Sequence, residues 1–158
     1  MSPSTARTLM DIDNERDRRS GFRPPDARPP ARGPWFQKTR LANNAFALET
    51  VSRQRRIIAY ARIGAGGQAD NELAAVRRLI EEHGHVVLRE VTDVSAPYAP
   101  LSRAGWNEAR RLVRRGLADG IAVLNRDAVS TWDQEYEDEL LWLGERPALL
   151  LLVISEVT

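Results

Sequence analysis

Apolar segments that alternate with amphipathic ones constrain the fold of this chain more than any other feature. Four short segments, 57–61, 85–91, 120–124 and 148–154, are rich in Ile, Val, Leu and Ala. Apolar runs of this length are typical of strands that are covered on both faces of a parallel sheet. We therefore expect four β-strands.

The segments between these strands have helical periodicity. We expect one helix over about 70–83, which Gly84 ends, and a second over about 104–117. A third begins near Ser130 or Thr131. The expected inward positions of the first two are Leu73, Val76, Ile80, Trp106, Ala109, Leu112 and Val113. Helices between strands predict an α/β fold, a three-layer sandwich around a mostly parallel sheet of four or five strands.

The first 56 residues differ in composition from the rest. They carry twelve basic and six acidic side chains, whereas the remainder carries eleven basic and sixteen acidic ones, so that +6 and −5 nearly cancel. Six of the nine prolines precede residue 35. A segment with so few apolar side chains cannot offset the entropy lost on ordering. We expect a disordered Arg/Pro-rich arm over 1–40, a short helix and basic linker over 41–56, and an α/β domain over 57–158.

The arm carries an aromatic pair among its basic residues. Such a pair could dock in a protein groove or stack on nucleic-acid bases, or it could fold back onto the domain. The residues expected to contact nucleic acid or a partner are Arg23, Arg28, Arg32, Trp35, Phe36, Lys38 and Arg40. The acidic stretch 135–139 could instead receive the arm. The helical spacing of Leu41, Ala45 and Leu48 predicts the short helix, which could cover one face of the domain.

Several classes of function are excluded by composition. The sequence has no cysteine, which excludes disulfides, thiolate metal sites and a cysteine nucleophile. Its two histidines cannot by themselves form a three-ligand zinc site. We therefore expect no metal and no cofactor. No apolar run approaches the ~18 residues that a membrane span needs, and the start lacks the apolar run of a signal peptide, so we expect a cytoplasmic protein without a membrane partner.

Polar residues follow the predicted strands at their carboxyl ends, where α/β sheets carry their chemistry. The stretches concerned are Tyr60-Ala61-Arg62-Ile63-Gly64 with Gln68, then Asp93, then Arg103-Ala104-Gly105-Trp106, and finally Arg126-Asp127-Ala128-Val129-Ser130-Thr131. In this order they resemble the motifs of the serine recombinase catalytic domain, in the resolvase/invertase family. Those motifs are Tyr-x-Arg-Val-Ser with a following Gln, an Asp, Arg-x-Gly-x and Leu-Asp-Arg-Leu-x-Arg. The resemblance covers about residues 57–156.

The resemblance implies a resolvase-like fold and, in active members, attack of the serine hydroxyl on a DNA phosphodiester. Here the serine position is Gly64, and two of the family's arginine positions are Ala128 and Thr131. Such a route needs a hydroxyl nucleophile and clustered positive charge for the phosphoryl group. The positions that keep the family's residue are Arg62, Gln68, Asp93, Arg103 and Asp127. We therefore interpret the chain as a pseudoenzyme with no catalytic residue.

The retained residues leave two interpretations. Arg62 and Asp127 could be the remainder of a phosphate site, or a buried arginine–carboxylate pair that stabilises the core. The glycines of 64–67 could cradle an anion or only form a tight turn. We also expect that the family's long helix after the last strand, and its DNA-binding region, are not encoded before Thr158.

These observations favour an interaction or regulatory module, linked to DNA transactions and with a protein partner. One alternative is an accessory DNA- or RNA-binding protein that acts through its basic arm, because a domain of net charge −5 disfavours duplex contact through its folded face. The other is a site-specific DNA recombinase that uses a different nucleophile.

Overall fold

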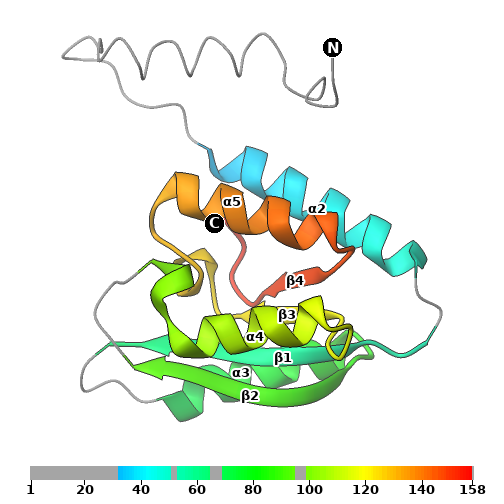
Figure 1. Ribbon diagram of the computed structural model, residues 1–158, viewed down its shortest axis with the longest axis horizontal. Helices are drawn as coiled ribbons and strands as arrows, with labels where there is room; N and C mark the ends of the chain where they lie inside the picture. Colours follow the sequence, from blue (N-terminus) through cyan, green and yellow to red (C-terminus); the bar gives the residue numbers. More distant parts are fainter. Residues whose placement is uncertain (1–31, 51–52, 65–68, 95–98, 158) are drawn as a thin grey trace, which may run out of the picture. The chain divides into compact units, whose positions relative to one another are not determined.

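The computed structural model describes residues 32–50, 53–64, 69–94 and 99–157. Contacts divide the chain into residues 1–31 and 32–158, and all described residues belong to the second unit. The prediction of a disordered arm therefore lies outside the described residues as far as residue 31. In chain order the elements are α2 (Gly33–Thr50), β1 (Arg56–Ile63), α3 (Ala69–Glu82), β2 (Val86–Val94), the 3-10 helix η2 (Pro100–Ser102), α4 (Ala104–Arg114), β3 (Gly120–Val123), the 3-10 helix η3 (Arg126–Ala128), α5 (Asp133–Glu145) and β4 (Leu149–Leu152) (Figure 1).

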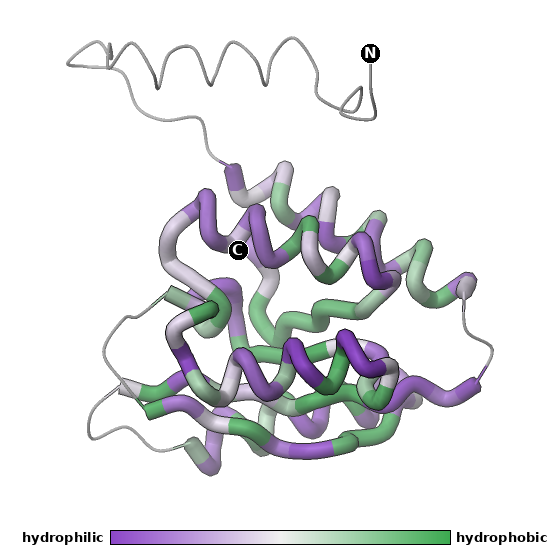
Figure 2. Tube along the Cα trace, in the orientation of Figure 1, coloured by the Kyte–Doolittle hydropathy of each residue, from purple (hydrophilic) through white to green (hydrophobic). Residues whose placement is uncertain are grey.

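The sheet has four strands in the order β2-β1-β3-β4. Each strand is parallel to its neighbour, so the predicted α/β fold with a parallel sheet is confirmed. Every residue of β3 and β4 is buried, as their continuous apolar sequence predicts. Figure 2 shows β3 and β4 as hydrophobic, whereas the helices alternate between hydrophobic and hydrophilic positions.

Helices cover both faces of the sheet and give the predicted three layers (Figure 1). α3 buries Leu73, Val76 and Ile80 against one face, in a cluster with the alanines and Ile57 of β1. α4 and α5 cover the other face of the sheet. The side chain of Trp106, from α4, and the buried side of α5 pack against that face. All the inward positions predicted for 70–83 and 104–117 are buried. α3 ends at Glu82, and Gly84 follows with φ +76°, a conformation that glycine adopts without strain.

The helix α2 corrects the prediction for the arm. It begins at Gly33, so residues 33–40 belong to the folded unit and the prediction that the arm reaches residue 40 is wrong. Pro34 fits the first turn of a helix, where its missing N–H costs nothing. The apolar residues whose spacing predicts the short helix within 41–56 lie on the exposed side of α2, because Leu41 and Leu48 are 51% and 46% exposed.

The buried side of α2 consists of Phe36, Arg40, Asn44 and Ala47. Two of these are polar because α2 lies along β4, the edge strand. The side chain of Asn44 donates from Nδ2 to the oxygen of Leu150 (2.9 Å) and accepts the N–H of Leu150 at Oδ1 (3.0 Å). Edge strands expose unpaired backbone groups, so Asn44 occupies hydrogen bonds that a fifth strand would otherwise make.

Candidate functional site

The carboxyl ends of β1, β2 and β3 bring together most of the residues that carry the resemblance. Arg62 of β1 and Asp93 of β2 are partners in the register of the sheet. Arg103 directly precedes α4, and Asp127 lies in η3 after β3. The prediction that these positions share one edge is therefore consistent with the structure. Gln68 and the glycines at 66 and 67 lie outside the described residues.

Asp93 is built into the protein interior and is 9% exposed. Its carboxylate accepts three hydrogen bonds, from the Tyr60 hydroxyl (2.6 Å), the Gly105 N–H (2.7 Å) and the Trp106 N–H (2.9 Å). The two N–H groups belong to the first turn of α4, where a negative charge is favourable. Gly105 is required there, because a Cβ at this position would lie 2.7 Å from Oδ2 of Asp93.

Arg103 is also buried, with 3% of its surface exposed. It donates to the backbone oxygens of Ala128 (2.7 Å) and Val129 and to the Tyr60 hydroxyl (3.3 Å). Burial, together with the hydrogen bond to Asp93, raises the pKa of Tyr60, so this hydroxyl stays protonated. The three side chains thus tie β1, β2, α4 and η3 together.

Arg62 has a different environment from the one predicted. It donates from Nη1 to the backbone oxygen of Asp127 (2.9 Å), while the Asp127 side chain is exposed. The interpretation of Arg62 and Asp127 as a buried arginine–carboxylate pair is therefore wrong. Of the two arginines that keep the family's residue, Arg103 is buried and Arg62 is partly exposed.

The three substituted positions differ in the space around them. Gly64 is exposed, and a Cβ placed on it would meet no described atom within 4 Å. Ala128 is 5% exposed and Thr131 is exposed. A side chain at position 64 would therefore have room, whereas a long side chain at position 128 would not.

The expected contact residues of the arm are divided between the interior and the surface. Phe36 and Arg40 are 0% and 6% exposed, so the prediction that they contact a partner is wrong and the fold-back alternative holds for them. Arg32 forms an ion pair with Glu137, within the acidic stretch that could receive the arm. Trp35 and Lys38 are exposed. Arg23 and Arg28 lie outside the described residues.

A buried network that joins α2, α5 and the segment after β4 was not predicted. Glu156 accepts two hydrogen bonds from Arg40 (2.7 and 3.0 Å) and one from the Tyr136 hydroxyl (2.7 Å). Burial alone would raise the pKa of Glu156, but the hydrogen bonds from Arg40 and Tyr136 outweigh it and lower the pKa. No local pattern marks this pairing, because its two charges are distant in the sequence.

The described residues hold no group of three or more His, Asp or Glu side chains placed to bind a metal ion. Among those same residues, no helix is long and apolar enough to cross a membrane.

Comparison with known proteins finds similarity in structure. No family model matches the sequence, and a search of curated proteins finds no significant match. The C-terminal catalytic domain of ISC1926 TnpA, an IS607-like serine recombinase, matches over 63% of this chain and 71% of its own, with 18% identity and a TM-score of 0.54. The N-terminal catalytic domain of TP901-1 integrase matches over 63% and 77%, with 16% identity and a TM-score of 0.56. The described part of this chain thus has the fold of a serine recombinase catalytic domain.

Proposed function

We propose that this chain is a non-catalytic domain of serine recombinase fold that acts as an interaction or regulatory module in DNA transactions. The observation that carries the proposal is Gly64, which stands where the resemblance would place the nucleophilic serine. Residues 63–68 contain no serine or threonine. Covalent cleavage of a phosphodiester in this way needs a hydroxyl group at that place.

The use of Asp93 and Arg103 supports the same proposal. Their hydrogen bonds go to Tyr60 and to backbone groups of α4 and η3, which is a structural role. Transfer of a phosphoryl group needs several guanidinium groups around the developing charge. Of the two arginines at positions that keep the family's residue, Arg62 is the partly exposed one.

The outer side of α2 supports a role in protein contacts. Four large apolar side chains, Trp35, Leu41, Phe46 and Leu48, are between 42% and 55% exposed. Apolar side chains that gather on one exposed element are typical of interaction surfaces. The partner of the proposed module is therefore a protein.

Incubation of the purified full chain with supercoiled plasmid tests the catalytic part. We expect neither nicking nor a covalent protein–DNA adduct, and an adduct formed by the wild-type chain would overturn the proposal. The variant Gly64→Ser is the matched test, because the new side chain has room. We expect no adduct from it either, since positions 128 and 131 still lack guanidinium groups. An adduct would show that the remaining residues suffice for cleavage.

Affinity capture tests the interaction part. The bait proteins are the wild-type chain, the double variant Leu41→Gln/Leu48→Gln, and the control Leu101→Gln, which changes an exposed leucine of η2. We expect a protein that binds the wild type and the control and is lost from the double variant. The same set of proteins on all three baits, or none on any, would contradict the proposed role of α2.

A further inference from the structure

Two arginines approach one aromatic ring where α4 meets α5. The guanidinium carbon of Arg110, on α4, lies 4.1 Å from the centre of the Trp142 ring. That of Arg146, just after α5, lies 4.1 Å from the same centre. Cation–π attraction favours each contact, but it also holds two positive charges close together.

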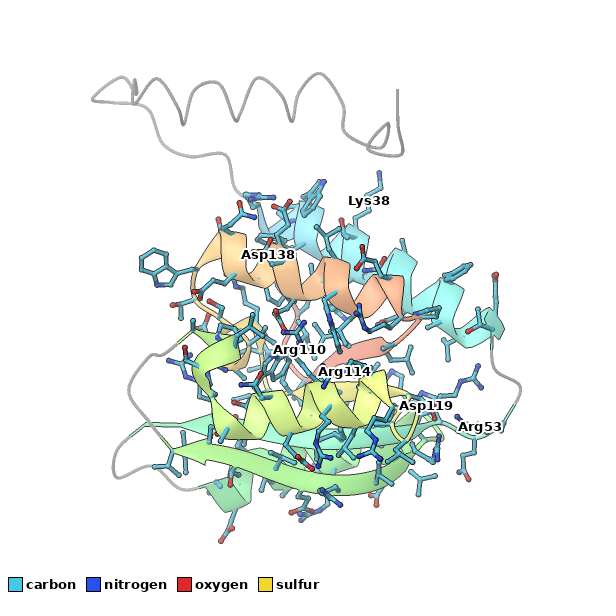
Figure 3. All side chains as sticks on the ribbon, in the orientation of Figure 1. Lys38, Arg53, Arg110, Arg114, Asp119 and Asp138 are labelled. Carbon is cyan, nitrogen blue, oxygen red and sulfur yellow. The ribbon has the colours of Figure 1, made fainter. Side chains whose placement is uncertain are left out.

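A third arginine adds to this charge. Arg114 lies one turn after Arg110 and is exposed, and Figure 3 labels both on the side of α4 that is nearest α5. Burial lowers the pKa of Arg110, and although Glu139 opposes this effect, repulsion from Arg146 and Arg114 lowers the pKa further. Arg114 and Arg146 are therefore each close enough to Arg110 to repel it.

The neighbouring carboxylates neutralise this cluster only in part. The Nε of Arg110 is 3.6 Å from Oε1 of Glu139, and Nη1 of Arg146 is 3.7 Å from Oε1 of Glu145. Glu139 already accepts a hydrogen bond from the Trp106 indole (2.7 Å). The Nε of Arg110 is buried and has no hydrogen-bond partner among the described residues. Within the part of the chain that the structure describes, Arg114 has no ion pair.

Two other arginines of the same region share one carboxylate. Arg89 and Arg111 share Glu108, at N–O distances of 2.9 and 2.7 Å. Arg110, Arg114 and Arg146 themselves outnumber the two carboxylates, Glu139 and Glu145, that pair with them. The net charge of the domain is negative, but a ligand responds to the local distribution of charge. A local positive excess can therefore attract an anion.

We propose that Arg110, Arg114 and Arg146 together bind a phosphate group, either free or in a nucleic-acid backbone. Guanidinium groups match the oxygens of phosphate with paired hydrogen bonds, and a bound anion would relieve the repulsion that Arg114 and Arg146 exert on Arg110. This site goes beyond the proposed function, since it does not involve the sheet edge at Gly64.

The indole N–H of Trp142 provides a local measurement. The full chain would be labelled with 15N-tryptophan, and the Trp142 signal assigned with Trp142→Phe. Separate titrations would use inorganic phosphate and a short DNA duplex with 5′-hydroxyl ends. We expect a saturable shift of the Trp142 signal with at least one of them, and none of the signal of Trp132, at the other end of α5. A shift with phosphate alone assigns free phosphate, and a shift with DNA alone assigns the backbone.

Matched variants separate this site from general charge attraction. Arg114→Gln and Arg146→Gln should each weaken the affinity about tenfold, because each removes a hydrogen bond between charged groups. The control Arg78→Gln removes the same charge from an exposed position on α3 and should have no such effect. No saturable shift with either probe, unchanged affinity in both variants, or equal weakening by the control would overturn the proposal. None of these outcomes bears on the cleavage assay.

Discussion

Arg40 and Arg62 differ in burial, in the opposite sense to the expected contact role of Arg40 and to one of the two interpretations of Arg62. Arg40 stands in a proline- and arginine-rich stretch, yet it is 6% exposed and binds a carboxylate. Arg62 ends an apolar strand within a recombinase-like motif, yet it is only half-buried and binds a single backbone oxygen. The comparison teaches that the burial of an arginine depends on its partner, and that this partner can lie far away in the sequence.

The largest effect is expected from Arg40→Met. The substitution keeps most of the side-chain volume but leaves the fully buried Glu156 carboxylate without its charge partner. Breaking a buried ion pair in this way costs about 3–5 kcal/mol of unfolding free energy. Urea unfolding followed by circular dichroism measures this loss. A cost within about 0.5 kcal/mol, as for a surface change, would remove the distinction between the two arginines.

An intermediate effect on the unfolding free energy is expected from removing the hydroxyl group of Tyr60 or Tyr136. Tyr60→Phe removes the donor to Asp93 at the sheet edge, and Tyr136→Phe removes the donor to Glu156 beside α2. Each loss should cost about 1–3 kcal/mol, because a charged acceptor loses a buried hydrogen bond. The same urea titration measures both. If Tyr60→Phe proved neutral, the network of Asp93 and Arg103 would not be a stabilising one.

A smaller effect is expected from pH. Because the folded-state pKa of Glu156 is below its ordinary value of 4.5, its contribution to stability is complete above that pH and is lost as the pH falls through the folded pKa. Glu156→Gln should therefore flatten the decrease in melting temperature below pH 4.5, whereas Arg62→Gln should leave the profile of the wild type unchanged. Parallel profiles for all three proteins would contradict the role assigned to Glu156.

The smallest effect is expected from Arg62→Gln itself. A half-buried side chain with one hydrogen bond to a backbone oxygen contributes little, so the unfolding free energy should change by no more than about 0.5 kcal/mol. Thermal unfolding of the variant beside the wild type checks this. A loss comparable to that of Arg40→Met would make Arg62 a structural residue after all.

The sequence predicted those parts of the fold that depend on local pattern. The apolar strands and the helices α3 and α4 are visible in the periodicity of residues such as Leu73 and Val76. The inner face of α2 is not, because Arg40 and Asn44 are buried by bonds to Glu156 and Leu150, which lie more than a hundred residues away.

The candidate site shows the same limit. The positions of Asp93 and Arg103 at one sheet edge follow from the order of strands and helices. Their structural roles do not, because the groups that they bind are mostly backbone N–H groups and oxygens. Backbone groups are the same for nearly every residue type, so hydrogen bonds to them cannot be predicted from the residues in the sequence.

The hydrogen bonds that hold α2 to β4 and to the segment after it also determine when α2 can dock during protein synthesis. Asn44 and Leu150 are 106 residues apart, and Arg40 and Glu156 are 116 apart. A ribosome therefore completes α2 long before it makes the strand that α2 covers. Until α5 has been made, Phe36 lacks the ring of Tyr136, against which it packs. Docking of α2 is consequently a late step in the maturation of the nascent chain, and until then the helix is open to chaperones.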